Sequence, residues 1–232
     1  MPVVFPVHSH LRGSLLSYPR LYAYPAEPEP PGDRFTILDS GAYSLSQRGQ
    51  SMTPGYMQQL AEHYHTHGAG NVFPVLAIAP DVFLNPTQTM KNWSWWQENI
   101  NQPVVPVLQA RKKGVLAGTG LLQQARFYAR WRPPVVAISN PGMRALQVDG
   151  FGLVLKMIRN LTSCHWLHNL GAGWDVDDAR RWLVMGFNSV DSIAYYTDAQ
   201  SGKAWRTTGG TEPSASSFVD LALWNAAAVR NL

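Results

Sequence analysis

Short apolar runs that close on a polar side chain recur along this chain. They occupy residues 35–39, 75–81, 104–109, 135–140 and 189–191, and they end on aspartate, glutamine or asparagine. Apolar runs of this length predict buried strands. In a parallel barrel, the carboxyl ends of the strands converge on one mouth, where the active site lies. The pattern therefore predicts a ring of strand ends that carries the polar side chains.

Helical segments separate these runs. Thr53 and Pro54 supply an N-cap and a first helical position, and Gly68 ends that helix. Asn85 and Pro86 open a second helix, whose three tryptophans are expected to pack and to cover the surface. Further helices are expected around residues 121–128, up to about residue 161, up to residue 186, and over residues 214–230.

Strands that alternate with helices at this rhythm are typical of parallel βα units. With a first strand at residues 3–5, the sequence shows seven strands, and an eighth is either hidden near residues 204–206 or absent. Residues 18–34, rich in Pro and Tyr, predict an irregular loop over one end of the barrel. The expected fold is α/β: a TIM-like (β/α)8 barrel, compact or incomplete, in a single domain. A doubly wound open sheet is the alternative, although no dinucleotide-binding glycine fingerprint follows any strand.

Length and composition agree with that fold. The chain has 232 residues, of which 45% are apolar and 15% are charged, so it can bury a sizeable core. No run approaches the roughly 18 apolar residues that span a bilayer, and the N-terminal residues lack the features of a signal peptide. We therefore expect a cytoplasmic protein with no membrane partner. Cys164 is the single cysteine, which excludes an intrachain disulfide and a cysteine-rich zinc site.

The formal charge of +4 is compatible with an anionic partner such as a nucleic acid. Nine Trp and nine Tyr add to this, because exposed aromatics beside cations bind nucleic acids, although most aromatics fill cores. The candidate phosphate contacts are Arg111, Lys112, Lys113, Lys203 and Arg206. Three like charges in one loop are equally consistent with an ordinary solvated loop.

The residues that close the run 35–39 carry the sharpest chemical signal. Asp39 is followed at once by Ser40 and Gly41. A carboxylate before Ser-Gly at the end of a buried strand is typical of a site built where the strand gives way to a loop. Asp also caps turns through side-chain to backbone hydrogen bonds, so this motif by itself leaves site and cap open.

Five short motifs occur in the same order as those of tRNA-guanine transglycosylases. They are Asp39-Ser40-Gly41-Ala42-Tyr43, Pro80-Asp81, Pro106-Val107-Leu108-Gln109, His168-Asn169-Leu170-Gly171-Ala172-Gly173 and Gly186-Phe187-Asn188-Ser189-Val190-Asp191-Ser192. Over about residues 35–195 the chain resembles a compact relative of this family, nearer to the phage and bacterial DNA deazaguanine transglycosylases. The resemblance implies a pentosyltransferase that replaces guanine in a nucleic acid with a 7-deazaguanine such as preQ0, through an aspartyl-glycosyl intermediate and without a cofactor. DNA is the expected polymer and tRNA the alternative.

The resemblance also implies roles for individual residues. Asp191 matches the nucleophilic aspartate, and Asp39 matches the general acid/base. Asp81 matches the carboxylate that holds the purine, and Gln109 the side chain that binds its carbonyl. The other expected substrate-binding residues are Ser40, Gly41, Asn140, Leu170 and Gly171. Two departures stand out: the zinc ligands of the family, three cysteines and a histidine, are absent, so no metal is expected, and Asn188 replaces an aspartate.

The chemistry itself calls for such residues. Exchange of a base at C1′ passes through an oxocarbenium-like transition state, so one carboxylate is needed to form a glycosyl-enzyme and another group to manage the proton. A third carboxylate can accept hydrogen bonds from the ring N–H and the exocyclic amine of a guanine-like edge, while Gln109 can donate to the carbonyl. The target base must first be turned out of its helix, at a cost of a few kcal/mol.

Two other function classes stay open. His8 and His10 after a first strand, with His165 or His168 and the late Asp191, resemble the metal amidohydrolases, and bound zinc would favour that class. A non-enzyme alternative is a nucleic-acid-binding accessory subunit, shaped like a transglycosylase but inactive. The presence of three aspartates at strand ends speaks against it, and failure to exchange any labelled base would speak for it.

Overall fold

The computed structural model describes residues 3–6, 20–26, 36–68, 75–109, 115–139, 150–171, 176–192 and 200–202. These residues form a mixed α/β protein whose paired strands all run parallel. The strands are β1 (Val3–Pro6), β2 (Arg20–Ala23), β3 (Thr36–Asp39), β4 (Val75–Ala77), β5 (Val107–Leu108), β6 (Val135–Ser139), β7 (Trp166–Leu170) and β8 (Ser189–Ser192). The α-helices are α1 (Ala42–Gln47), α2 (Pro54–Gly68), α3 (Pro86–Asn99), α4 (Val115–Tyr128), α6 (Phe151–Thr162) and α7 (Val176–Met185).

The strands form two parallel sheets, ordered β1-β8-β7-β6-β5 and β2-β3-β4. A parallel bridge between Ile78 and Val105 joins the second sheet to the first, with a backbone hydrogen bond of 2.9 Å from Ala79 N to Val105 O. At the other margin β1 lies against β2. Within the part of the chain that the structure describes, no hydrogen bond pairs β1 with β2, so the strands are not shown as a closed ring.

Strand β2 corrects the expectation of an irregular loop over residues 18–34. It pairs with β3 along its whole length, with Arg20 opposite Thr36 and Ala23 opposite Asp39. Its two central side chains, Leu21 and Tyr22, are both buried, on opposite faces of the strand. Tertiary pairing thus makes a strand from a segment whose flanking prolines predict a loop. The eighth strand is therefore β2, and residues 204–206 lie outside the described residues.

Alternate residues of the strands face two different environments. Val107 and Ala137 belong to a cluster between the strands, whereas Leu108 and Ile138 pack beneath the helices. Side chains two positions apart on a strand share a face. Gln109, which follows Val107 by two positions, is therefore directed to the interior side. The same alternation explains why a polar residue can end an apolar strand without disturbing the layer under the helices.

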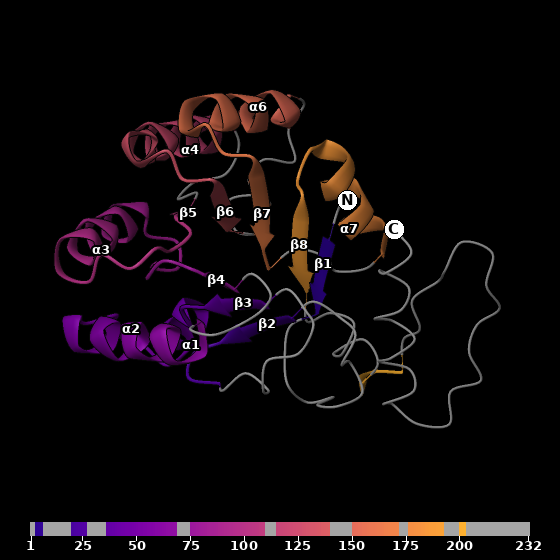
Figure 1. The fold of residues 1–232 in the computed structure, drawn as a ribbon. Coiled ribbons are helices and arrows are strands. Elements are labelled where there is room, and N and C mark those ends of the chain that lie inside the picture. Colours follow the sequence, from indigo (N-terminus) through magenta and orange to yellow (C-terminus); the bar gives the residue numbers. More distant parts are fainter. Residues whose placement is uncertain are drawn as a thin grey trace.

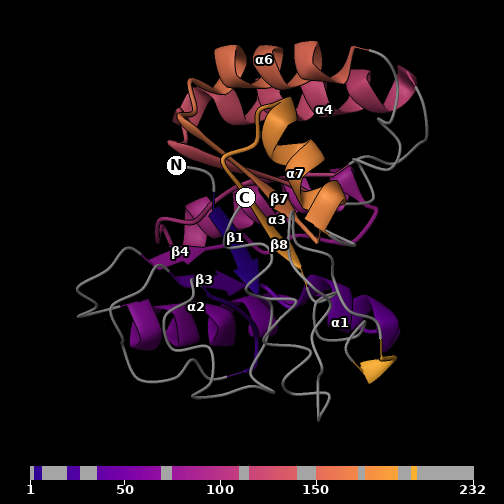
Figure 2. The same cartoon turned by 90° about the vertical axis from the view of Figure 1, so that its right-hand side faces the viewer.

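Helices surround the strands. Figure 1 shows α2 beside β2 and β3, α3 near β4 and β5, α4 and α6 over β6 and β7, and α7 beside β8. Figure 2 confirms that α4 and α6 lie on the opposite side of the molecule from α2. Trp93 and Trp96 of α3 are 3% and 0% exposed, so these two tryptophans are core residues and not surface cover. Cys164 is buried and unpaired, as expected.

The helix starts predicted from the sequence are confirmed where the structure describes them. Thr53 Oγ1 accepts from Tyr56 N at 3.2 Å at the start of α2, and Asn85 Oδ1 accepts from Gln88 N at 3.0 Å at the start of α3. Helix α1 was not expected. The expected helix over residues 214–230 lies outside the described residues. None of the helices described is long and apolar enough to cross a membrane.

Candidate functional site

The carboxyl ends of neighbouring strands place several polar residues at one level. Ser139 is opposite Leu170, and Phe5 is opposite Asp191. Continuing the registers of β5 with β6 and of β7 with β8 by one residue puts Gln109 level with Ser139 and Leu170 level with Asp191. Side chains in such a row share one face of the sheet. The fold therefore lines up Gln109 and Asp191, which are 82 positions apart in the printed sequence.

A hydrogen-bonded network links Ser40, Asp81 and Gln109. Ser40 Oγ donates to Asp81 Oδ1 at 2.6 Å, and Gln109 Nε2 donates to Asp81 Oδ2. All three side chains are buried. Because the donors come from the ends of β3 and β5, the Asp81 carboxylate is clamped from two sides. Three of the residues expected to bind substrate are thus brought together.

Gln109 is itself held by Gln124 of α4. Gln124 Oε1 accepts from Gln109 N at 2.8 Å, and Gln124 Nε2 donates to Gln109 O at 2.6 Å. The side-chain Oε1 of Gln109 accepts from Leu84 N at 2.8 Å. Its amide oxygen is therefore engaged with the loop after β4, and its amide nitrogen with Asp81. This arrangement makes Gln109 a support for Asp81, a role that the sequence did not suggest.

Asp39 lies beside the other two site aspartates. Burial, first, and the negative charge of Asp81, second, raise the pKa of Asp39 from 3.8 to about 7, while the backbone N–H of Gly41 opposes the rise and the charge of Asp191 adds to it. Gly41 N donates to Asp39 Oδ2 at 3.2 Å. A carboxyl group with a pKa near neutrality can both donate and accept a proton at physiological pH. Asp39, Asp81 and Asp191 therefore sit within electrostatic reach of one another.

The pKa of Asp81 is raised less than that of Asp39, because hydrogen bonds stabilise the Asp81 carboxylate. Burial raises its pKa from 3.8 to about 6, while the hydrogen bonds from Ser40 and Gln109 oppose the rise. Donors that contact the ionised form favour it. Of the two carboxyls, Asp81 is thus the better held as an anion, and Asp39 is the one poised to exchange a proton.

The turn that carries Asp39 is fixed by its neighbours. Gly41 has φ 74°, and a Cβ at this position would lie 2.5 Å from Tyr24 O. The hydroxyl of Tyr56 donates to Ser40 O at 2.8 Å. Helix α1 has Gly41 at its N-cap with no side-chain cap bond, so Asp39 does not cap the helix. Asp39 does accept the hydrogen bond from Gly41 N by which an aspartate caps a turn, so the turn-capping interpretation of the motif fits the geometry alongside the site interpretation.

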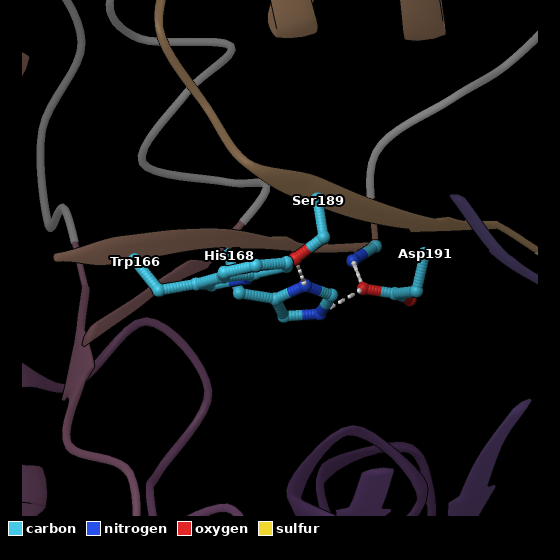
Figure 3. Close-up of polar contacts among 5 residues, drawn as sticks. Trp166, His168, Ser189 and Asp191 are labelled. Carbon is cyan, nitrogen blue, oxygen red and sulfur yellow. Dashed lines mark hydrogen bonds and ion pairs between the residues drawn. The ribbon is translucent and has the colours of Figure 1, made fainter. Parts of the chain in front are cut away.

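Asp191 is held through one oxygen only. Gly171 N donates to Asp191 Oδ1 at 2.8 Å, and His168 Nε2 lies 3.1 Å from the same atom. Figure 3 shows His168 between Ser189 and Asp191. Among the described residues Asp191 Oδ2 has no hydrogen-bond partner. One carboxylate oxygen is therefore anchored, and the other is available for chemistry.

Ser189, His168 and Asp191 are the three residue types of a serine hydrolase. His168 Nδ1 lies 2.7 Å from Ser189 Oγ, and Trp166 Nε1 donates to the same hydroxyl at 2.7 Å. Ser189 is 0% exposed. A nucleophilic hydroxyl must reach its substrate, and this one is enclosed by protein and already contacted twice. The arrangement therefore does not support a hydrolase in which Ser189 attacks.

The other residues expected in the site are either placed by the structure or lie outside its described part. Leu170 packs into the cluster between the strands, and Gly171 reaches Asp191 through its backbone. Asn188 Oδ1 accepts from Arg159 Nη2 at 2.6 Å and from Leu167 N at 2.9 Å, so Asn188, where the resemblance implied an aspartate, ties α6 to β7. Outside the described residues lie Asn140, Arg111, Lys112, Lys113, Lys203, Arg206, His8 and His10.

Potential metal ligands do not gather in the described part of the chain. No group of three or more His, Cys, Asp or Glu side chains that could hold a metal is found there. His165, a member of the amidohydrolase set, is exposed.

Sequence reasoning missed two polar residues of the site and one aromatic pair near it in the chain. Gln124 is hidden in the apolar pattern of α4, and Ser189 lies within a strand whose pattern drew attention to Asp191 only. Tyr43 of α1 and Phe83, from the segment after β4, form an edge-to-face pair with ring centroids 5.1 Å apart. The one available signal was the alternation of polar residues at 166, 168, 189 and 191, which indicates a shared face of two adjacent strands.

Two comparisons with known proteins complete the description of the site. Neither a scan against protein-family models nor a search of the curated proteins finds a match for this chain.

Proposed function

We propose that this chain is a base-exchange transglycosylase, which replaces guanine in a nucleic acid with a 7-deazaguanine through an aspartyl-glycosyl intermediate. The observation that carries the proposal is the grouping of Asp39, Asp81 and Asp191, from the end of β3, the segment after β4 and the end of β8. Their mutual charge is what raises the pKa of Asp39 beyond the effect of burial. Base exchange needs a nucleophile, a proton carrier and a base-holding carboxylate, and the three aspartates offer one of each.

The scaffold of the proposal is a (β/α)8 barrel. Eight parallel strands follow one another in chain order from β2 to β8 and then to β1, and helices lie outside them. In such a barrel the residues at the carboxyl ends of the strands surround one mouth. Asp39, Asp191 and Gln109 lie at, or directly after, such ends, and Asp81 lies in the segment that follows β4. β1 and β2 stand at the two ends of the strand order and lie against each other. In a doubly wound open sheet the two edge strands would lie apart.

Asp191 is the proposed nucleophile. Its free oxygen, Oδ2, attacks C1′ of the target nucleotide, the C1′–N9 bond breaks, and guanine departs with the bonding electrons. Asp39, protonated near neutral pH, gives the departing base its proton. The incoming base then loses a proton to Asp39 and attacks C1′, which releases the Asp191 carboxylate. Both half-reactions balance without any further reactant.

Asp81 is the proposed base-holding group. Each of its oxygens accepts one hydrogen bond from protein, and each retains a second lone pair. Those lone pairs can accept from the ring N–H and the exocyclic amine of a guanine-like edge. Gln109 Nε2 has one hydrogen left after its bond to Asp81, which can reach the carbonyl of the base. The clamp from Ser40 and Gln109 fixes the orientation that such recognition requires.

The favoured polymer is DNA, because the motifs of the sequence resemble those of the DNA enzymes and the cysteines of the tRNA family's zinc site are lacking. The test incubates the purified protein with duplex DNA and, separately, with total tRNA, each with labelled preQ0 at matched low salt. Label is expected in DNA, and Asp191→Asn should incorporate none. Label in tRNA alone would overturn the choice of polymer and keep the chemistry. No label in either would overturn the function.

One observation favours a second class. His168 and Asp191, two members of the metal amidohydrolase set, are in contact at 3.1 Å. Both ring nitrogens of His168 already face protein partners, so metal binding would require the ring to leave them. Elemental analysis decides between the classes. Stoichiometric zinc that is lost together with activity on chelation would favour the amidohydrolase, and full activity after chelation the transglycosylase.

A further inference from the structure

We propose that His168 is the positioning residue of Asp191: its Nε2–H anchors Oδ1 and so presents Oδ2 to C1′. The inference rests on the proposed function, since it gives Asp191 the role of nucleophile. It adds a residue that the chemistry alone does not require, and a reason for the polar face shared by β7 and β8.

The contacts form a single line across two strands. Trp166 Nε1 donates to Ser189 Oγ at 2.7 Å, Ser189 Oγ lies 2.7 Å from His168 Nδ1, and His168 Nε2 lies 3.1 Å from Asp191 Oδ1. The two strands alternate in contributing these side chains, as Figure 3 shows. His168 is opposite Ser189 in the register of β7 with β8, so the backbone pairing itself brings these two side chains together.

The chemistry of the four groups selects one tautomer of the histidine. Indole N–H is a donor only, so Trp166 occupies a lone pair of the Ser189 hydroxyl. The hydrogen of that hydroxyl then has His168 Nδ1 as its acceptor among the described residues. An Nδ1 that accepts leaves the ring proton on Nε2, where it points at Asp191. The opposite tautomer would leave the Ser189 hydrogen buried without an acceptor, at a cost of about 1–3 kcal/mol.

Burial makes the line rigid. Ser189 and His168 are 0% and 1% exposed. Rotation of the ring by half a turn would replace both contacting nitrogens with carbons, so the ring has one satisfactory orientation. The imidazole therefore behaves as a fixed donor, comparable to the backbone N–H of Gly171 that contacts the same oxygen.

Two fixed donors on Oδ1 suit a carboxylate that must attack through Oδ2. When the C1′–Oδ2 bond forms, Oδ1 becomes the carbonyl oxygen of an ester and still accepts from His168 and Gly171. When that bond breaks in the second half-reaction, the returning negative charge meets the same donors. In the first half-reaction the two donors hold Oδ2 in line with C1′, where a misplacement of about 1 Å can cost about 10²-fold in rate. In the second they stabilise the charge that returns to the carboxylate.

The experiment separates the contact with Asp191 from the contact with Ser189 by side-chain length. The side-chain amide of glutamine reaches the place of the histidine Nε2, where its nitrogen can donate to Asp191, and that of asparagine reaches the place of Nδ1, where its oxygen can accept from Ser189. Single-turnover formation of the covalent complex is measured with guanine-containing duplex DNA, and preQ0 affinity by titration. We expect His168→Leu and His168→Asn to slow covalent complex formation by about 10²-fold, because Oδ2 is no longer held in line with C1′. His168→Gln should restore it to within about tenfold, and preQ0 affinity should stay within about twofold in all three.

Asn169 supplies the matched control. It is the next residue of β7, is 0% exposed, and its side chain faces the opposite side of the strand, where its amide atoms have no hydrogen-bond partner among the described residues. Asn169→Leu should leave covalent complex formation unchanged. Nitrogen-15 NMR of labelled histidine should show the neutral Nε2–H tautomer for His168, and this preference should be lost in Ser189→Ala.

The outcomes distinguish failure of the proposed function from failure of the positioning role of His168. If the wild-type protein exchanges no base in DNA or tRNA, the proposed function fails and the positioning role falls with it. If the wild type exchanges base and His168→Leu does so equally fast, only the positioning role is overturned. Equal losses in His168→Gln and His168→Asn, or an Nδ1–H tautomer in the wild type, overturn it as well.

Discussion

The side chains of Asp81 and Gln109 are joined by a hydrogen bond from Nε2 to Oδ2, although 28 positions separate the two residues in the chain. Asp81 follows β4, and Gln109 follows β5, and the bridge between Ile78 and Val105 holds these segments side by side. Because Ser40 contacts the other oxygen of the carboxylate at 2.6 Å, Asp81 is fixed by residues of two other loops. The base-holding site is therefore a product of tertiary structure.

Asp81 and Ser40 give the first prediction. Asp81→Ala should lower the affinity for preQ0 more than it lowers exchange at saturating base. Ser40→Ala removes one hydrogen bond to the carboxylate, so affinity should fall by about 0.5–1.5 kcal/mol, or roughly 2–12-fold. Isothermal titration measures the preQ0 affinity of both variants. Ser46→Ala, on the exposed part of α1, is the control and should bind normally. Unchanged affinity in Asp81→Ala would contradict the assignment.

Asp39→Asn should separate activity from stability. Exchange should fall by about 10²–10⁴, as for other general acid/base groups. Because the folded state raises the pKa of Asp39 from 3.8 to about 7, the native protein binds this proton more tightly than the unfolded chain, and stability falls as pH rises between these values. Asparagine does not ionise, so the variant does not lose this stability as the pH rises. The variant should therefore be more stable than the wild type at pH 8, by roughly 1–4 kcal/mol, and equally stable near pH 4.

Thermal melts at the two pH values check this second prediction. One kcal/mol corresponds to about 2–4 °C for a chain of this size. Asp177→Asn is the control, because the side chain of Asp177 is 86% exposed and has only a surface pair with Arg180. Its melting temperature should stay close to that of the wild type, because an exposed surface pair contributes little to stability. A lower melting temperature for Asp39→Asn at pH 8 would contradict the origin assigned to the raised pKa.

Asp191→Asn should abolish the covalent intermediate and keep nucleic-acid binding. The amide oxygen can still accept from Gly171 and His168, but the amide nitrogen is not a nucleophile. Denaturing gels of protein with labelled DNA and no incoming base should show a stable adduct for the wild type and none for the variant. Peptide mass spectrometry of the wild-type adduct should locate it on Asp191. An adduct on any other residue would refute the assignment.

Gln124 should matter through Gln109. Gln124→Leu leaves the backbone N–H and C=O of Gln109 without their partners, each at a cost of about 1–3 kcal/mol. We expect a lower free energy of unfolding in urea and weaker binding of preQ0, because Gln109 positions Asp81. Gln123→Leu changes the adjacent, exposed residue of the same helix and should do neither. Full preQ0 affinity in a folded Gln124→Leu protein would show that Gln109 does not depend on it.

Gly41→Ala and Gly49→Ala form a matched pair. Both glycines have positive φ, 74° and 65°, so each substitution strains the backbone by about 1 kcal/mol. A Cβ at position 41 would also lie 2.5 Å from Tyr24 O and 2.9 Å from Tyr56 Oη, whereas nothing lies within 4 Å at position 49. Gly41→Ala should therefore be the more destabilising in urea unfolding, and it alone should lose exchange activity. Equal losses would show that the turn has room to move.

The sequence predicted the elements whose causes are local. Asn85 and Pro86 start a helix because the cap and the fixed φ act within one turn, and the apolar run over residues 135–139 forms β6 over its full length. The same pattern pointed to the polar residues at strand ends, so the order of apolar and polar positions was enough to propose Asp39, Asp81, Gln109 and Asp191. Strand β2 was missed because its cause is distant: pairing with β3 overrides the loop signal of the prolines beside it.

What only the tertiary structure decided is which of these residues meet, and through which atoms. Spacing along the chain carries no information on whether Gln109 contacts a base or the Asp81 carboxylate, since both partners lie on other strands. The raised pKa of Asp39 likewise depends on burial and on two charges that come from β8 and from the loop after β4. His168 offered only an alternation of polar positions, and the register of β7 with β8 turned that alternation into a contact with Ser189 and Asp191. Residue types and strand ends are thus properties of the sequence, whereas hydrogen-bond partners and proton affinities are properties of the folded chain, because they depend on atoms that the sequence places far apart.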